Sequence, residues 1–211
     1  MKILVTAFEP FGGELLNSSG EALTLADEKT AGADIVKLIL PVVFGESARL
    51  LERAVQREAP DAVLCLGEAG GRDLITPERV AINLEDARIP DNAGDQPTDR
   101  PVEPGGPDAC FTTLPVKRMA LAIREAGLPA SVRLSAGSFV CNHLMYSLLR
   151  FCRKEYPRTR AGFMHLPLLT AQAAAKTPPL PGFEAEDLAR GIEAAISAIA
   201  QSLREENGPS S

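Results

Sequence analysis

The sequence lacks the features of several large classes of protein. Its 211 residues contain no apolar run near the roughly 18 residues that a membrane-spanning helix needs. Residues 1–5 lead into Phe8-Glu9-Pro10 and not into an apolar stretch with a cleavage site, so we expect no export signal. The 22 Lys and Arg are outnumbered by 28 Asp and Glu, and this net charge of −6 argues against nucleic-acid binding, which needs a basic face. We therefore expect a small or peptidic partner, with neither nucleic acid nor a membrane.

Cysteines are few and lack the spacing of a metal site. The four cysteines form no CxxC pair: Cys65, Cys110, Cys141 and Cys152. A chain of this length with 45% hydrophobic residues can bury a core without disulfides, and its length corresponds to roughly one domain. We expect a single cytoplasmic domain over residues 1–211, with reduced thiols and a polar tail from about residue 205.

Apolar strand-like runs alternate with helix-like runs along the chain. We expect strands at residues 2–7, 34–41, 62–66, 78–84, 130–134 and 160–167, and helices at 20–28, 46–58, 115–126, 142–154 and 184–203. The run 62–66 is apolar throughout, as in a parallel strand that is covered on both faces. The pattern predicts an α/β fold of three layers, with a mostly parallel twisted sheet flanked by helices.

The most informative stretch is residues 134–146, where Cys141 lies between an expected strand and an expected helix. A thiol at a helix N-terminus lies beside unpaired backbone N–H groups and the positive end of the helix dipole, which favour the nucleophilic thiolate. The same N–H groups can hold the oxyanion that forms when a thiolate attacks a carbonyl. A buried structural cysteine is the alternative interpretation.

A cysteine hydrolase also needs a base, and the sequence contains only two histidines. His143 lies two residues beyond Cys141 on a helix, roughly 200° around the axis, so it should point away from the thiol. His165 lies near the end of an expected strand, at the sheet edge where the Cys141 turn should also lie. We therefore expect His165 to be the base, with either Glu78 or Asp91 orienting it.

Three loops offer candidate binding groups. Phe8, Phe11 and Asn17 follow the first strand and could form an apolar slot with one polar handle, or simply pack the loop onto the sheet. The region 85–107 has little regular pattern, which is typical of a lid, a binding loop or an interface, and Arg88 and Asp91 are its functional candidates. The glycine-rich turn 67–72 lacks a following Gly-Lys-Ser/Thr, so its glycines indicate close backbone approach and not phosphate binding.

Together these segments make the chain resemble the pyroglutamyl peptidase I family of cysteine peptidases over essentially its whole length. The resemblance rests on Phe8-Glu9-Pro10-Phe11-Gly12-Gly13 with Asn17-Ser18, on the turn at 67–70 with Ile75-Thr76-Pro77-Glu78-Arg79-Val80-Ala81-Ile82-Asn83, on Ala87-Arg88-Ile89-Pro90-Asp91-Asn92, on Ser135-Ala136-Gly137-Ser138-Phe139-Val140-Cys141-Asn142 and on Gly162-Phe163-Met164-His165-Leu166-Pro167.

The resemblance implies site roles that the residue pattern alone does not provide. Glu78, Cys141 and His165 would form the triad. The pyroglutamate pocket would be walled by Phe8, Phe11, Phe139 and Val140, with Asn17 bonding to the lactam and Arg88 near the oxyanion. The resemblance also implies a phosphorylase-like α/β fold, a homotetramer, and removal of N-terminal pyroglutamate from peptides without a metal or an organic cofactor.

The chain departs from the family pattern at two places. Close bacterial relatives usually have Gln where this chain has Glu68, a pocket position at which an anionic side chain would change the site. The common Asn-Pro-Ser is replaced by Asn17-Ser18-Ser19, which keeps the asparagine but loses a fixed φ.

Other functions remain open at this point. They are a nucleoside-phosphorylase-like binder, a non-catalytic peptide-binding relative and a cysteine amidase acting on another small acyl group.

Overall fold

The computed structural model describes residues 1–207 and shows an α/β fold built on one six-stranded sheet. Four strands run parallel at its centre: β1 (Lys2–Phe8), β3 (Ala33–Leu40), β4 (Ala62–Glu68) and β8 (Arg160–Leu166). Short antiparallel strands close the two edges: β2 (Lys29–Thr30) beside β3, and β5 (Thr76–Glu78) beside β8. The strand order is β2-β3-β1-β4-β8-β5.

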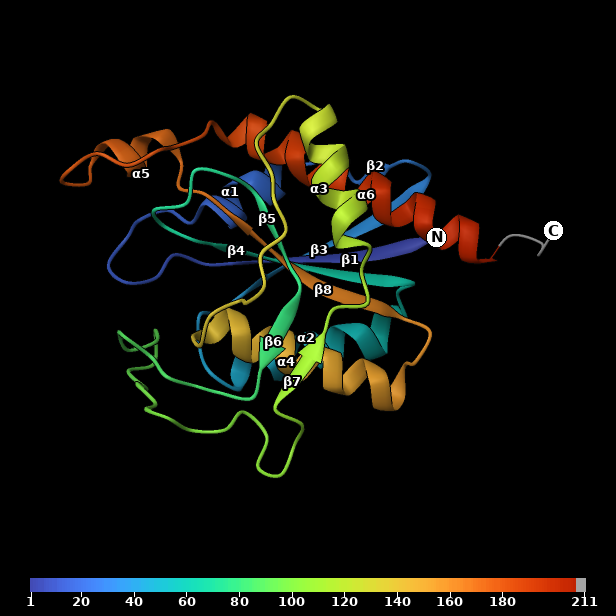
Figure 1. The fold of residues 1–211 in the computed structure, drawn as a ribbon, viewed down its shortest axis with the longest axis horizontal. Coiled ribbons are helices and arrows are strands. Elements are labelled where there is room, and N and C mark those ends of the chain that lie inside the picture. Colours follow the sequence, from blue (N-terminus) through green and yellow to red (C-terminus); the bar gives the residue numbers. More distant parts are fainter. Residues whose placement is uncertain (208–211) are drawn as a thin grey trace.

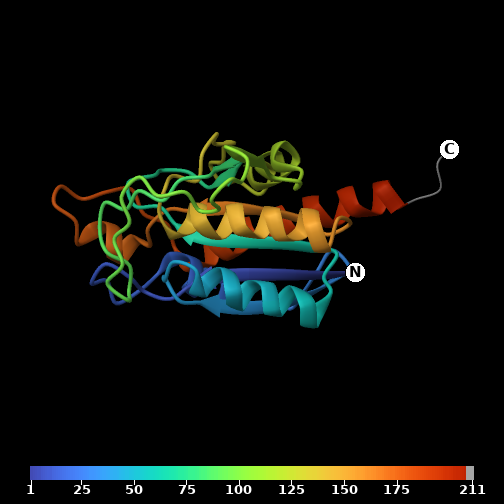
Figure 2. The same cartoon turned by 90° about the horizontal axis from the view of Figure 1, so that it is seen from below.

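Helices cover both faces of this sheet (Figures 1 and 2). One face carries α1 (Ser18–Leu25), α3 (Val116–Glu125) and α6 (Ala185–Asn207), and the other carries α2 (Glu46–Glu58) and α4 (Val140–Glu155). Because side chains alternate along a strand, Ile3 and Val5 of β1 enter the first core while Leu4 and Phe8 enter the second. The expected three-layer architecture is therefore confirmed.

The local patterns gave helices more accurately than strands. The expected helix 46–58 is α2 residue for residue, and the helix expected at 142–154 is α4 with slightly wider limits. The short helix α5 (Thr170–Ala174) was not expected. Expected strand 130–134 is wrong, because this segment forms only isolated bridges, between Ala130 and Ile75 and between Arg133 and Glu78 of the short edge strand β5.

The strand expected at 78–84 divides into two elements. Thr76–Glu78 belongs to the main sheet, whereas β6 (Val80–Ile82) pairs with β7 (Ala109–Phe111) in a separate ribbon. Arg79 lies at the division, where its N–H donates to Arg133 and its carbonyl accepts from Thr112. The chain thus leaves one sheet and enters the next within a single residue.

The C-terminal end also differs from expectation. Helix α6 continues through Asn207, beyond the expected tail boundary, and residues 208–211 lie outside the described part of the chain. Within residues 1–207, no helix has the length and apolar character that crossing a membrane requires.

Candidate active site

Cys141 lies at the second residue of α4, whose N-cap is Phe139 in an extended conformation. The first backbone N–H groups of a helix have no acceptor within the helix. The N–H groups of Val140 and Cys141, the first two residues of α4, therefore have no acceptor within the helix and lie beside the thiol. This confirms the expected location of the cysteine at a helix N-terminus.

Gly67 at the end of β4 permits the close approach of this thiol. A Cβ at Gly67 would lie 2.9 Å from the Sγ of Cys141 and 2.7 Å from the ring of Phe163. In the parallel pairing of β4 with β8, Gly67 is also the register partner of His165. The glycine therefore allows the thiol to lie against the strand pair that carries the histidine, as the glycine-rich turn predicts.

His165 and Glu78 form a buried hydrogen-bonded pair. The Nδ1 of His165 lies 2.8 Å from the Oε1 of Glu78, and the two side chains are 5% and 0% exposed. Antiparallel pairing places Thr76 of β5 opposite His165, and Glu78 lies two residues further along the same face of the strand. With Nδ1–H donating to the carboxylate, Nε2 is the nitrogen that can accept a proton.

The charges of this pair follow from its surroundings. Burial lowers the pKa of His165, and this effect outweighs the opposing influence of Glu78. Burial alone would raise the pKa of Glu78, but hydrogen bonds from His165 and Arg72 outweigh it, so the pKa lies below its ordinary value. Glu78 is therefore a carboxylate near neutral pH, beside an imidazole that favours its neutral form.

The thiol differs from the sequence-based expectation. Burial, followed by the negative charge of Glu78, raises the pKa of Cys141 to about 12. The stabilisation expected from the helix N-terminus is therefore smaller than the cost of placing a thiolate in this site. These shifts favour a resting pair of a thiol and a neutral imidazole, so Cys141 would need a base to remove its proton before it could act as a nucleophile.

Asp91 does not share the role of Glu78, which corrects one of the two alternatives. Its carboxylate accepts the N–H groups of Phe44, Ala93 and Asp95, each at 2.9 Å. These bonds close a turn in the region 83–108 and fasten it to the loop after β3. Asp91 therefore orders the wall of the site, since Phe44 packs edge-on against Phe139 with ring centroids 5.5 Å apart.

His143 points away from the thiol, as predicted. Its Nδ1 lies 2.5 Å from Glu85, and its Nε2 accepts the N–H of Gly45 at 3.1 Å. Arg100 also donates to Glu85 at 2.5 Å. Both imidazole nitrogens thus serve contacts that fix the surrounding loops.

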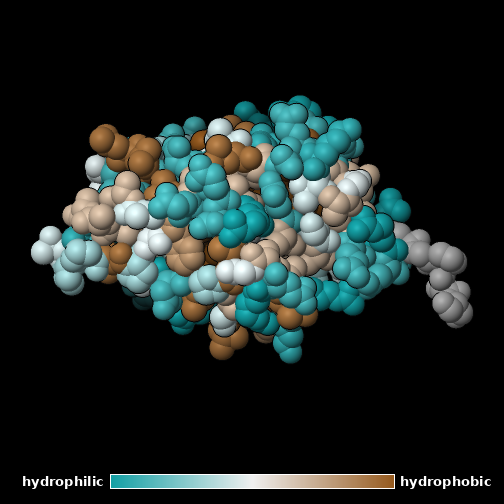
Figure 3. All heavy atoms as spheres, turned by 90° about the horizontal axis from the view of Figure 1, so that it is seen from above, coloured by the Kyte–Doolittle hydropathy of each residue, from teal (hydrophilic) through white to brown (hydrophobic). Residues whose placement is uncertain are grey.

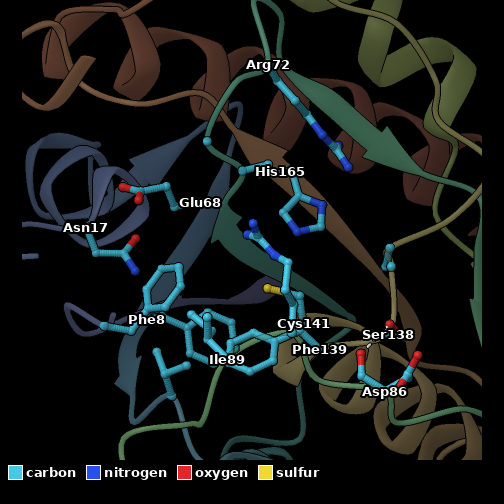
Figure 4. Close-up of a pocket in the computed structure, with 17 residues that line it drawn as sticks. Phe8, Asn17, Glu68, Arg72, Asp86, Ile89, Ser138, Phe139, Cys141 and His165 are labelled. Atoms are coloured by element: carbon cyan, nitrogen blue, oxygen red, sulfur yellow. Dashed lines mark hydrogen bonds between the residues drawn. The ribbon is translucent and has the colours of Figure 1, made fainter. Parts of the chain in front are cut away.

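Cys141 and His165 open onto a cavity of about 380 Å³ (Figure 4). Its apolar lining comes mainly from loops at the carboxyl ends of the strands: Phe8, Phe11, Val42, Ile89 and Phe139. Its charged and polar lining includes Asn17, Glu68, Arg72, Asp86, Arg88 and Ser138. The structure thus brings together every predicted pocket residue except Val140, which is fully buried in the core under α4.

Asn17 and Glu68 are both engaged by the protein at the far side of the cavity from His165 (Figure 4). Asn17 is the N-cap of α1, and its Oδ1 accepts from the N–H of Ser19 at 3.0 Å while its Nδ2 donates to the carbonyl of Glu9. The carboxylate of Glu68 accepts from the N–H of Ser18 at 2.7 Å and from Gln172 at 3.0 Å. Burial raises the pKa of Glu68, and this effect is larger than the lowering caused by the hydrogen bonds from Ser18 and Gln172.

Sequence reasoning did not single out several residues of the cavity lining, among them Val42, Asp86, Ile89 and Ser138, and it missed two residues with specific hydrogen bonds at the site, Arg72 and Asn142. Arg72 ends the glycine-rich turn and reaches Glu78, and only its position after that turn could have indicated it. Asn142 is fully buried and bonds to the backbone of β6 through both of its side-chain heteroatoms. An asparagine directly after Cys141, inside a helix, was the available sign of such a contact.

Known proteins match the chain over almost its full length. A family model described as pyroglutamyl peptidase matches residues 1–202. The pyrrolidone-carboxylate peptidase of Streptococcus suis (strain 05ZYH33) is 50% identical over 201 residues, covering 95% of this chain and 93% of the relative. Pyrrolidone-carboxylate peptidase 1 of Streptococcus pneumoniae serotype 4 is 52% identical over 199 residues, covering 94% and 92%.

Solved structures agree with this match. Pyroglutamyl peptidase I of Bacillus amyloliquefaciens superposes with a TM-score of 0.90 at 41% identity, covering 95% of this chain and 97% of that chain. A mutant pyrrolidone carboxyl peptidase from Pyrococcus furiosus superposes with a TM-score of 0.91 at 38% identity, covering 96% and 100%. The chain therefore belongs to the pyroglutamyl peptidase family of cysteine peptidases.

Proposed function

We propose that this protein hydrolyses the amide bond after an N-terminal pyroglutamyl residue, with Cys141 as nucleophile and His165 as base. The observation that carries the proposal is the buried His165–Glu78 pair beside a thiol at a helix N-terminus, in one small and mostly apolar cavity. Family membership supports the same reaction. Glu78 holds the tautomer of His165 in which Nε2 accepts a proton.

The first half of the reaction forms an acyl-enzyme. The Nε2 of His165 takes the thiol proton of Cys141 as Sγ attacks the pyroglutamyl carbonyl. The negative charge on the carbonyl oxygen is stabilised by N–H groups at the start of α4 and by Arg88 at the cavity. His165 then gives its proton to the departing amine, which leaves a thioester on Cys141.

The second half releases the product. His165 takes a proton from water, whose oxygen attacks the thioester carbonyl. When the carbon–sulfur bond breaks, the proton returns to the thiolate. Pyroglutamate leaves and the neutral thiol–imidazole pair is restored.

The cavity fits the chemistry of the substrate. Pyroglutamate is a neutral five-membered lactam without a free amine, so it suits an apolar slot with few polar contacts. Phe8, Phe11 and Phe139 supply the apolar wall and Asn17 a polar group for the lactam. Glu68 is the acidic exception on this wall, and its raised pKa reduces the charge that it presents.

The reaction is tested by release of a fluorescent amine from a pyroglutamyl amide under reducing conditions. We expect release from wild type, no release from Cys141→Ser, and no release from the matching alanyl and prolyl amides. Comparable turnover of the alanyl amide would contradict pyroglutamyl specificity and favour an amidase with a broader acyl preference. Phosphate-dependent cleavage of a nucleoside would favour a phosphorylase.

We also propose a homotetramer in the cytoplasm. Large apolar side chains are exposed on the chain, among them Leu15 at 91%, Leu134 at 75% and Phe111 at 67%, and Figure 3 shows separate apolar patches on an otherwise largely hydrophilic face. All four cysteines are free, which fits the cytoplasm, where disulfides are rare. Light scattering of the purified protein tests assembly, and a monomeric mass at micromolar concentration would contradict it. Cell fractionation tests location.

A further inference from the structure

Arg72 is a cationic group beside the catalytic pair that the mechanism above does not use. It ends the glycine-rich turn after β4, where its N–H donates to the carbonyl of Ala69 at 3.3 Å and Gly71 has a φ of +84°. This turn directs the chain back toward β5. The guanidinium then lies next to His165 at the upper side of the cavity (Figure 4).

The guanidinium of Arg72 hydrogen-bonds to the carboxylate of Glu78, which in turn hydrogen-bonds to the imidazole of His165. Nη1 of Arg72 donates to Oε1 of Glu78 at 2.5 Å and also to the hydroxyl of Thr76. That hydroxyl lies 3.3 Å from the same Oε1 and can donate to it. Thr76 and Glu78 lie on one face of β5, so a single arginine engages both of them.

The contacts of Glu78 are strongly unequal. Oε1 accepts hydrogen bonds from His165, Arg72 and Thr76. The buried Oε2 has no hydrogen-bond partner among the described residues. The orientation of the carboxylate therefore depends on the donors at one oxygen. His165 supplies only one of these three donors, so Arg72 and Thr76 provide the rest of the restraint on the carboxylate.

We propose that Arg72 is a positioning residue, which fixes the Glu78 carboxylate and shares its charge so that Glu78 orients His165 without holding it as an imidazolium. The inference rests on the proposed roles of Glu78, His165 and Cys141. Thr76 assists by joining the guanidinium to the carboxylate. Arg72 itself acts through Glu78 and not on the substrate.

The electrostatic effects of Arg72 agree with this arrangement. It contributes to the lowering of the pKa of Glu78 and of His165, and it opposes the rise in the pKa of Cys141. Loss of its charge would therefore favour the imidazolium and disfavour the thiolate. The first change reduces the fraction of enzyme in which His165 is neutral and can take a proton, and the second makes the proton of Cys141 harder to remove.

The competing role is direct contact with substrate, since Arg72 also lines the cavity. The two roles differ in what they change. A substrate contact that is equal in the ground state and the transition state changes KM and leaves kcat intact. A positioning role changes kcat and the pH dependence of the reaction.

The test compares Arg72→Gln and Arg72→Lys with Arg79→Gln as the matched control. Arg79 is also near Glu78 in sequence, but it lines a separate groove with Phe111 and Leu134. We expect Arg72→Gln to lower kcat/KM for the pyroglutamyl amide about 10- to 100-fold, mainly through kcat, as for loss of a charged hydrogen bond. The acid limb of its pH profile should move to higher pH. Arg72→Lys should recover part of the rate, and Arg79→Gln should behave as wild type.

A second measurement does not depend on turnover. The chain has only two histidines, so NMR titration in a Cys141→Ser background can follow the signals of His165 separately from those of His143. Arg72→Gln should raise the titration midpoint of His165. If Arg72→Gln does not fold, Thr76→Val takes its place and should shift His165 in the same direction by a smaller amount.

The outcomes separate the two levels of inference. An unchanged His165 midpoint, or a loss confined to KM, overturns the positioning role of Arg72. A shifted midpoint together with full activity of Cys141→Ser would support the role of Arg72 and overturn the proposed nucleophile.

Discussion

Gly67 supplies the sharpest test of the proposed active-site geometry, because one added methyl group would meet both the thiol of Cys141 and the ring of Phe163, which packs on His165. In Gly67→Ala, the new Cβ would lie 2.9 Å from the Sγ of Cys141, 2.7 Å from Cζ of Phe163 and 3.1 Å from its Cε1. Ordinary contacts of this kind begin at 3.4 Å, so the thiol must retreat by about 0.5 Å (3.4 − 2.9) and the ring by about 0.7 Å (3.4 − 2.7). Phe163 is fully buried and packs on the ring of His165 with centroids 4.8 Å apart.

These displacements set the expected magnitudes. A misplacement of about 1 Å in a reacting group can reduce a rate by roughly 100-fold, so shifts of half that size at two groups should reduce kcat/KM about 10- to 100-fold. Overpacking a buried site should also lower the free energy of unfolding by about 1–3 kcal/mol. The rate loss per folded molecule is the informative quantity.

The assay measures kcat/KM for the pyroglutamyl amide, the rate of Cys141 alkylation and the free energy of unfolding in urea. The matched control is Gly191→Ala in α6, where a Cβ would lie 2.6 Å from the side chain of Ile75, in the core on the α6 side of the sheet. That variant should share an overpacking effect but keep kcat/KM. Wild-type kcat/KM in Gly67→Ala would refute the argument that close packing on β4 fixes the nucleophile.

Three further predictions concern the acidic and histidine side chains around the site. Glu78→Gln should reduce kcat/KM by about 100- to 10,000-fold, whereas Asp91→Asn should reduce it by less than about 10-fold, and equal losses would contradict their different contacts. His143→Ala should keep most of its activity but lower the free energy of unfolding by about 1–3 kcal/mol, because Glu85 then keeps only Arg100; a large loss of kcat/KM without unfolding would argue against this. Because burial raises the pKa of Glu68, the folded protein keeps the Glu68 proton at a pH where the unfolded chain has already released it. Glu68 therefore does not destabilise the fold below the pKa that it has in the unfolded chain, and it becomes destabilising as the pH rises through the pKa that it has in the folded protein. Glu68→Gln should remove that part of the pH dependence in urea unfolding, and identical slopes for the two proteins would be evidence against it.

The features that sequence predicted well depend on local periodicity or on strand ends. The helix 46–58 has buried positions at Ala48, Leu51 and Val55, a spacing that only a helix brings to one face. His165 was found because it lies near the carboxyl end of a parallel strand, and Cys141 because it lies at the start of a helix, although the strand expected before that helix does not form. These arguments need no knowledge of distant partners.

The features that sequence did not decide depend on nonlocal pairing. The choice between Glu78 and Asp91 follows from the antiparallel register of β5 against β8, which no local pattern of residues 76–78 specifies. Segment 130–134 has strand-like residues, yet it forms only two isolated bridges, one to Ile75 and one to Glu78 at the end of the three-residue edge strand β5. Val140 was assigned to the pocket by resemblance, but its position at the start of α4 turns it into the core.

The two histidines show why a residue type near a nucleophile does not by itself identify a base. Both carry a carboxylate on Nδ1, Glu85 for His143 and Glu78 for His165, so the orienting partner does not distinguish them. The difference lies at Nε2. In His143 this nitrogen already accepts the N–H of Gly45. Adding a proton to Nε2 would place two N–H donors against each other in a buried contact. In His165 the ring lies between Arg72 and Cys141 and borders the cavity, so its Nε2 can accept a proton without breaking a structural bond (Figure 4). A histidine–glutamate pair therefore stabilises loops at His143 and suits acid–base chemistry at His165. The difference is set by the contacts of Nε2 in each residue.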